Sequence, residues 1–163
     1  MSAVVVEKAI KQSVGMGQVG FMEECGELVA ILGSCIGVAM YCPRLKLAGL
    51  AHVVLPSSDG RDGPPGRYAD LAIPHMVTQF RHRGAALSSI AVRIAGGAAM
   101  FGRPGPMQIG INNAQAVKAA LAKAGLELIN EHLGGNKGRR MSINAATGEV
   151  FVEIVGQGVT LLH

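Results

Sequence analysis

Three short apolar runs in the first third of the chain limit the fold more than any other sequence feature. They cover residues 28–32, 36–41 and 47–55. Such runs, when Gly, Ser and Pro lie between them, are typical of strands rather than of helices. Residues 43–46 are polar enough to turn the chain between the second run and the third. We therefore predict that these two runs form an antiparallel hairpin.

Two helices and further strands are predicted beyond the hairpin. Residues 68–83 carry apolar side chains near helical spacing, and Gly84 is suited to end that helix. A second helix is expected at residues 113–124, with Asn112 or Asn113 as its cap and Gly125 as its stop. Further strands are predicted at residues 90–95, 126–131, 141–144 and 150–155.

The order of these elements indicates the architecture. The strands cluster between the helices instead of alternating with them. We therefore predict one domain over residues 1–163 of the α/β (α+β) class, a layered sandwich of mixed β-sheets with two main helices packed outside. Residues 57–67 (SSDGRDGPPGR) have the composition of a mobile surface loop.

Composition narrows the class of protein. Apolar residues make up 49% of the 163 residues, which is enough to bury a core. The net charge is +4, but the basic residues are scattered and no aromatic platform accompanies them, so nucleic-acid binding is not expected. No apolar run approaches the roughly 18 residues of a membrane span, and no secretory signal is visible. The three cysteines, an odd number, predict free thiols, and we expect a cytoplasmic protein that does not insert into membranes.

Two motifs suggest a cofactor or a metal but fit neither well. Residues 15–20 (GMGQVG) match the dinucleotide pattern G-x-G-x-x-G, yet the stretch before them is a poor strand and Gly26 interrupts the stretch after them. Cys25, Cys35, Cys42 and His52 lack the close Cys pairs of structural zinc sites. We expect a glycine-rich turn, no cofactor and no metal.

Cys35 and His52 are the candidates for chemistry. Gly33, Ser34 and Gly37 surround Cys35, and such small neighbours let a substrate approach and let backbone N–H groups face a developing oxyanion. The predicted hairpin brings the strand of His52 beside Cys35, where an imidazole would activate the thiol. From spacing alone, both residues are also consistent with ordinary core positions, because free Cys is often buried and a His among apolar residues is usually hydrogen-bonded in the core.

Six ordered motifs make the chain resemble the CheD family over nearly its whole length. They are Val14-Gly15-Met16-Gly17, Leu32-Gly33-Ser34-Cys35, Ala51-His52-Val53-Val54-Leu55-Pro56, Gly66-Arg67-Tyr68-Ala69-Asp70, residues 95–101 (AGGAAMF) with Ile109-Gly110, and Gly134-Gly135-Asn136.

This resemblance implies a fold shared with other cysteine deamidases. It implies an enzyme that converts glutamine side chains in the cytoplasmic domains of chemoreceptors to glutamate. Cys35 would be the nucleophile and His52 its base, and Gly33 and Ser34 would line the oxyanion site. A CheC-type phosphatase of the chemotaxis response regulator would be a second partner.

One departure from the family concerns the residue that orients the histidine. The family carries a Thr as third member of its triad, at the position that Val29 occupies here. The loss of that hydroxyl keeps open an alternative from another class, a weakly active or non-catalytic adaptor that binds CheC or receptors. An esterase acting on methylated glutamates would use the same nucleophile, so the sequence does not separate it from a deamidase.

Overall fold

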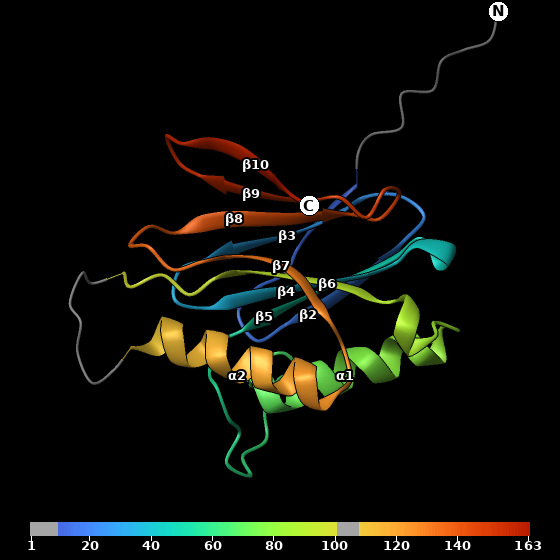
Figure 1. Ribbon diagram of the computed structural model, residues 1–163, viewed down its shortest axis with the longest axis horizontal. Coiled ribbons are helices and arrows are strands. Elements are labelled where there is room, and N and C mark those ends of the chain that lie inside the picture. Colours follow the sequence, from blue (N-terminus) through green and yellow to red (C-terminus); the bar gives the residue numbers. More distant parts are fainter. Residues whose placement is uncertain (1–9, 101–107) are drawn as a thin grey trace, which may run out of the picture.

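The protein forms three layers, two β-sheets and a layer of two helices (Figure 1). The computed structural model describes residues 10–100 and 108–163. The outer sheet has the order β1-β3-β8-β9-β10 and the central sheet the order β2-β5-β4-β6-β7. Each contains one parallel pair, β1 with β3 and β6 with β7, among antiparallel ones. The predicted sandwich of mixed sheets with helices outside is confirmed.

Each sheet consists of five strands in the described ranges. The outer sheet consists of β1 (Lys11–Ser13), β3 (Glu27–Leu32), β8 (Arg139–Asn144), β9 (Val150–Ile154) and β10 (Gly158–Leu162). The central sheet consists of β2 (Val19–Glu23), β4 (Ile36–Cys42), β5 (Leu47–Val53), β6 (Ala91–Gly96) and β7 (Leu128–Leu133). The helices are α1 (Ala69–His82) and α2 (Ile109–Lys123), with short 3-10 turns at Pro43–Leu45 and Leu87–Ser89.

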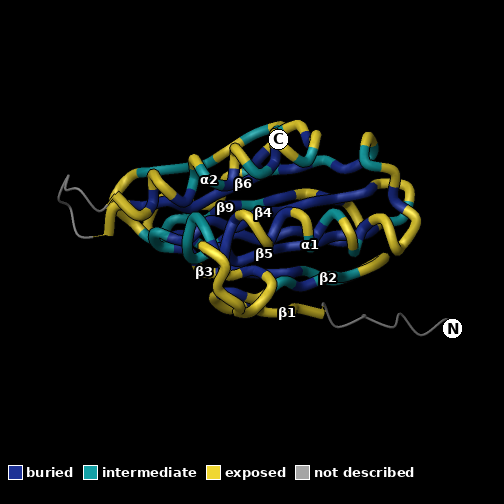
Figure 2. The backbone as a smooth tube through the Cα atoms, turned by 90° about the horizontal axis from the view of Figure 1, so that it is seen from below, coloured by how far each residue is buried: buried dark blue, intermediate teal, exposed yellow. Residues whose placement is uncertain are grey.

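The predicted hairpin is the centre of the molecule. Strands β4 and β5 pair antiparallel, from Ile36 opposite Val53 to Cys42 opposite Leu47. Every residue of both strands is buried, because the outer sheet covers one face of the central sheet and the helices cover the other (Figures 1 and 2). Strands buried on both faces read as continuous apolar runs, which is why the sequence revealed them.

Two apolar clusters hold the layers together. One joins the central sheet to the helices and includes Val38, Met40, Ile73, Met76 and Phe80. The other fills the space between the two sheets and includes Leu28, Leu32, Leu50 and Met141, together with Cys35. No helix in the described ranges is long and apolar enough to cross a membrane.

The structure also contains elements that the sequence did not predict. Strands β1 and β10 lie at the two edges of the outer sheet and are largely exposed, so they lack an apolar pattern. Strand β2, at the edge of the central sheet, was also missed. Helix α2 begins at Ile109, earlier than predicted, and the prediction that Asn112 or Asn113 caps it was wrong. Both lie inside the helix, and the side chain of Asn113 is fully buried and bonded to distant backbone instead.

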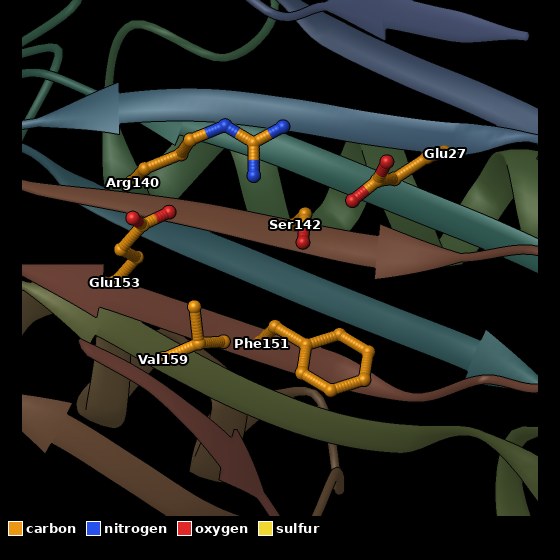
Figure 3. Close-up of a pocket in the computed structure, with 6 residues that line it drawn as sticks. All are labelled: Glu27, Arg140, Ser142, Phe151, Glu153 and Val159. Carbon is orange, nitrogen blue, oxygen red and sulfur yellow. The ribbon is translucent and has the colours of Figure 1, made fainter.

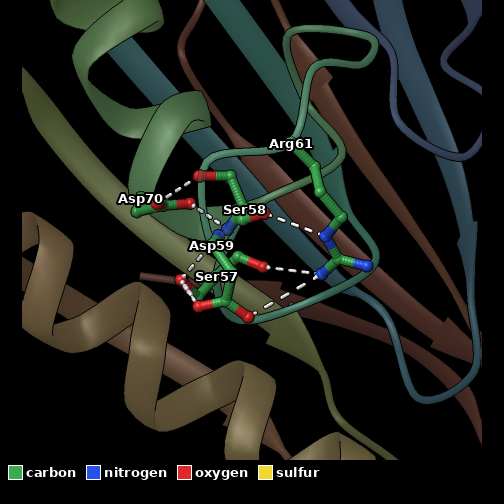
Figure 4. Close-up of polar contacts among 5 residues, drawn as sticks. All are labelled: Ser57, Ser58, Asp59, Arg61 and Asp70. Carbon is green, nitrogen blue, oxygen red and sulfur yellow. Dashed lines mark hydrogen bonds and ion pairs between the residues drawn. The ribbon is translucent and has the colours of Figure 1, made fainter.

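The loop of residues 57–67 lies mostly on the surface but is tied at both ends. The Asp70 carboxylate accepts hydrogen bonds from the Ser58 backbone N–H at 2.9 Å and from the Ser58 hydroxyl at 2.8 Å (Figure 4). The guanidinium of Arg61 donates back to the carbonyls of Ser57 and Ser58. At the other end, the backbone N–H of Gly66 donates to the Gly17 carbonyl at 2.9 Å. The mobility of this loop stays a prediction.

Candidate active site

Cys35 and His52 lie on the same face of the β4–β5 hairpin. His52 is directly opposite Gly37 in the register, and Cys35 stands two residues before Gly37, at the bend that precedes β4. Side chains two apart point to the same side of a sheet, and Leu50 and Cys35 both belong to the cluster between the sheets. The two candidate residues therefore face the same intersheet space, where Cys35 is 8% and His52 4% exposed.

Any side chain at position 37, beside His52, would force side chains of the outer sheet to shift. A Cβ atom there would lie 2.6 Å from Sδ of Met141 and 2.9 Å from Cδ1 of Leu32, both in the outer sheet. Such distances are far below van der Waals contact. The missing side chain lets the outer sheet approach closely at the level of the imidazole.

Backbone groups of residues 14–18 hold His52 in place. Its Nδ1 lies 2.9 Å from the carbonyl oxygen of Val14. Its main chain is bonded on both sides, with Gly17 N–H donating to the His52 carbonyl at 2.9 Å and His52 N–H donating to the Gln18 carbonyl at 3.0 Å. A carbonyl oxygen only accepts, so Nδ1 must carry the proton in the neutral ring. The other nitrogen, Nε2, is then the unprotonated one and can act as a base.

Burial keeps both candidate groups uncharged at rest. Desolvation lowers the pKa of His52 below its ordinary value of 6.5, and the hydrogen bond to Val14 opposes that shift. Desolvation also raises the pKa of Cys35, opposed by its own backbone N–H. A neutral imidazole and a neutral thiol are therefore the resting forms near neutral pH. Neutral resting forms are compatible with general-base transfer of the thiol proton and do not favour a preformed ion pair.

The bend that carries Cys35 is fixed through three consecutive carbonyl groups. The Gly33 carbonyl accepts from Ala98 N–H at 2.9 Å, and the Cys35 carbonyl from Gly97 N–H at 3.0 Å. The Ser34 carbonyl accepts from the side-chain amide of Asn113 at 3.2 Å. Within the described residues, no hydrogen bond runs from the N–H of Ser34 or Cys35 to another residue. These two N–H groups are therefore the candidate oxyanion donors.

The side chain of Val29 does not face His52, and Cys35 and His52 are not hydrogen-bonded to each other in the described structure. Strand alternation places Val29 on the face of β3 opposite to Leu28 and Ala30, which belong to the intersheet cluster, so its side chain is directed away from the His52 side. Between Cys35 Sγ and the His52 ring, both in the described part of the chain, there is no hydrogen bond. Cys25 is exposed, and Cys42 is buried, with its sulfur 3.4 Å from the Ser89 hydroxyl.

Residues 14–18 connect β1 to β2, and residues 19 and 20 of the glycine motif already belong to β2. No helix follows the motif, so the arrangement that a dinucleotide requires is missing from this part of the chain. In the described ranges, no group of three or more His, Cys, Asp and Glu side chains has the arrangement of a metal site.

Two of the hollows in the surface lie on the outer sheet. Figure 3 shows one of them over strands of the outer sheet. Its lining consists of Glu27, Arg140, Ser142, Phe151, Glu153 and Val159. A neighbouring hollow includes Ile31, Arg140 and Val155. Neither of these two hollows is lined by Cys35 or His52.

Comparison with known proteins identifies the family. The model of the family described as "CheD chemotactic sensory transduction" matches residues 54–154. The chain is 40% identical over 153 residues to the chemoreceptor glutamine deamidase CheD of Thermotoga maritima, covering 93% of this chain and 97% of that one. The chain belongs to the CheD family.

Other relatives of this CheD chain carry a similar name. Probable chemoreceptor glutamine deamidases CheD from Clostridium botulinum and Methanococcus maripaludis are 40% and 38% identical to it. They match 91% and 85% of the chain, and 96% and 92% of their own lengths. Among solved structures, the Bacillus licheniformis hypothetical protein YfiH matches 68% of this chain and 46% of its own, at 16% identity and a TM-score of 0.38.

Two residues of the site were missed from the sequence. Val14 contributes a carbonyl group, which every residue has, so no pattern of side chains could reveal it. Asn113 did carry a signal, because an Asn inside a helix needs a reason for its poor propensity. The start of α2 was misplaced, and this signal was interpreted as a cap.

Proposed function

We propose that this CheD protein deamidates glutamine side chains in the cytoplasmic domains of chemoreceptors, with Cys35 as nucleophile and His52 as base. The observation that carries the proposal is the hydrogen bond of His52 Nδ1 to the Val14 carbonyl, which leaves Nε2 as the basic nitrogen on the face that Cys35 shares. The names of the relatives support the reaction and the substrate. A receptor substrate of this kind would place the enzyme in the cytoplasm.

The first half-reaction forms a thioester. His52 Nε2 takes the proton of the Cys35 thiol while sulfur attacks the amide carbon of the glutamine side chain. The oxygen of the tetrahedral intermediate becomes negative, and the N–H groups of Ser34 and Cys35, with Gly33 beside them, stabilise it. The C–N bond then breaks, and the nitrogen leaves as ammonia with the proton from His52.

The second half-reaction restores the enzyme. His52 Nε2 takes a proton from water, and the resulting hydroxide attacks the thioester carbon. The C–S bond breaks, Cys35 regains its proton, and the product is a glutamate side chain. The sum is amide plus water giving acid plus ammonia, and no cofactor or metal takes part.

A second candidate is an adaptor that binds receptors or a CheC-type phosphatase and has little chemistry of its own. The observation that favours it is the absence of a hydrogen bond between Cys35 Sγ and the His52 ring, both described residues, together with the burial of both groups. Binding of a CheC-type partner is compatible with either candidate.

Mass spectrometry of a receptor cytoplasmic fragment after incubation with the protein tests the proposal. Each deamidated glutamine adds about one mass unit. We expect modification by the natural sequence and by Cys25→Ala, whose thiol is exposed and unrelated to His52, but none by Cys35→Ala. An inactive natural sequence on a verified substrate would favour the adaptor, and an active Cys35→Ala protein would overturn the assignment of the nucleophile.

A further inference from the structure

Asn113 joins the two segments of the candidate site through one side chain. Its amide nitrogen donates to the Ser34 carbonyl at 3.2 Å and to the Val54 carbonyl at 2.9 Å. Ser34 directly precedes Cys35, and Val54 stands two residues after His52. Asn113 itself comes from α2, which lies on the other face of the central sheet (Figure 1), and its side chain is 0% exposed.

The bond to Ser34 fixes the direction of the neighbouring N–H group. In a trans peptide the C=O and the N–H point in opposite directions. When the Ser34 carbonyl is held toward Asn113, the N–H of Cys35 must point away from α2. In this direction it lies against the Cys35 sulfur, where it lowers the pKa of the thiol against the effect of burial.

Asn113 supplies a bond that the backbone does not. The carbonyls on either side, those of Gly33 and Cys35, are bonded to N–H groups of Ala98 and Gly97. The Ser34 carbonyl has only the Asn113 side chain among described donors. The Oδ1 atom of Asn113 is buried and has no hydrogen-bond partner in the described structure, which is costly for a side chain that served packing alone.

We infer that Asn113 is a positioning residue, which sets the Ser34–Cys35 peptide so that the Cys35 N–H faces the reacting atoms and keeps this bend in register with the His52 strand. The inference rests on the proposed function for its effect on turnover, but the effect on the Cys35 thiol does not require any receptor substrate.

The experiment replaces Asn113 by Ala and measures two quantities in full-length protein. The first is the rate of Cys35 alkylation by iodoacetamide against pH, in a Cys25→Ala background so that the exposed thiol does not interfere. The second is kcat and KM for deamidation of a receptor fragment. We expect the alkylation midpoint to move to higher pH and kcat to fall about tenfold or more with KM little changed, because the lost group orients an oxyanion donor.

Two matched variants serve as controls. Asn112→Ala removes the same residue type from the preceding position of α2, where it is exposed. Tyr41→Phe removes a buried hydrogen bond between distant segments, from the Tyr41 hydroxyl to the Ala145 carbonyl at 2.8 Å, away from the site. Both should keep the alkylation midpoint and kcat of the natural sequence.

Thermal unfolding shows whether Asn113→Ala is folded at the assay temperature. If it is not, the near-isosteric Asn113→Asp decides by the same readouts, because a buried unpaired carboxyl is protonated and retains one donor for two carbonyls. Its alkylation midpoint and its kcat should lie between those of the natural sequence and those expected when both hydrogen bonds of Asn113 are lost.

The outcomes separate the two proposals. A folded Asn113 variant with an unchanged midpoint and unchanged kcat overturns the inference, as does an equal loss in Tyr41→Phe. A natural sequence that deamidates nothing, with an alkylation midpoint that still depends on Asn113, overturns the proposed function and supports the positioning of Cys35.

Discussion

Nδ1 of His52 and the carbonyl oxygen of Val14 lie 2.9 Å apart, although 38 positions separate the two residues. The main-chain N–H of Val14 also donates to the Val29 carbonyl at 2.7 Å. The backbone of Val14 therefore connects β3 to the imidazole. In a triad the third member holds the histidine in one tautomer and orientation, and here a main-chain carbonyl can fill that role.

Val29→Thr should leave kcat within about twofold, because the orienting role does not depend on a hydroxyl at this position. The side chain of Val29 lies on the opposite face of β3 from Leu28 and Ala30. The measurement is kcat for receptor deamidation, with thermal unfolding alongside, since a buried unpaired hydroxyl costs about 1–3 kcal/mol. A large gain in kcat would mean that the Val14 carbonyl does not orient His52 well enough.

Protonation of His52 should reduce both stability and activity at acid pH. Burial lowers the pKa of His52 in the folded state below its ordinary value of 6.5, so the unfolded chain binds more protons as the pH falls below that value. Stability is then lost from about pH 6.5 downward, through the folded pKa. Since the base must be neutral, kcat/KM, which reports the free enzyme, should have its acid limb below pH 6.5 as well.

Thermal unfolding between about pH 7.5 and pH 5.5 measures this effect. The natural sequence should lose more of its unfolding temperature over this range than His52→Gln does. His82→Gln, which changes an exposed histidine at the end of α1, is the control and should behave like the natural sequence. Equal losses in all three proteins would show that His52 does not contribute.

Cys42→Ala should lower stability and spare activity. The Cys42 side chain is fully buried in the cluster between the central sheet and the helices, with its sulfur 3.4 Å from the Ser89 hydroxyl. Loss of a buried sulfur leaves a small cavity, for which we expect about 1–2 kcal/mol in chemical denaturation. The kcat of the folded variant should equal that of the natural sequence. A dead but folded Cys42→Ala protein would contradict the choice of Cys35.

Asp70→Ala should loosen the loop of residues 57–67. The carboxylate of Asp70 bonds both the N–H and the hydroxyl of Ser58, and it also lies in the first turn of α1, where negative charge is favourable (Figure 4). We expect a loss of about 1–3 kcal/mol in stability and faster amide hydrogen exchange in the loop. Asp62→Ala, an exposed change in the same loop, is the control and should alter neither quantity.

The sequence predicted the parts of the fold that bury apolar surface. Strands β4 and β5 and helix α1 were placed within about two residues, because their apolar patterns report burial directly. Strands β1 and β10 could not be placed, since edge strands are held by main-chain hydrogen bonds that any sequence can make. Their pairing depends on the position of β3 and β9, which is set by the tertiary structure.

The sequence allowed us to name the reactive side chains of the candidate site but not the groups that orient them. Cys35 and His52 could be named, and the hairpin that aligns them could be drawn from the turn between their strands. The groups that orient them are main-chain carbonyls and one helical Asn, and none of these has a sequence pattern of its own. Their roles depend on which segments lie side by side, which spacing along the chain does not determine.

The partners of the bend at Gly33–Cys35 come late in the chain. Gly97 and Ala98 follow β6, and Asn113 stands 79 positions after Ser34. During synthesis, the bend emerges long before any of these donors exists, and contacts of such sequence separation form only once the intervening chain is available. A chain that has not reached these donors therefore cannot form the hydrogen bonds that hold the carbonyls of Gly33, Ser34 and Cys35. We therefore expect a chain that ends before α2 to lack the deamidase activity proposed for Cys35, because the donor to the Ser34 carbonyl is missing from it.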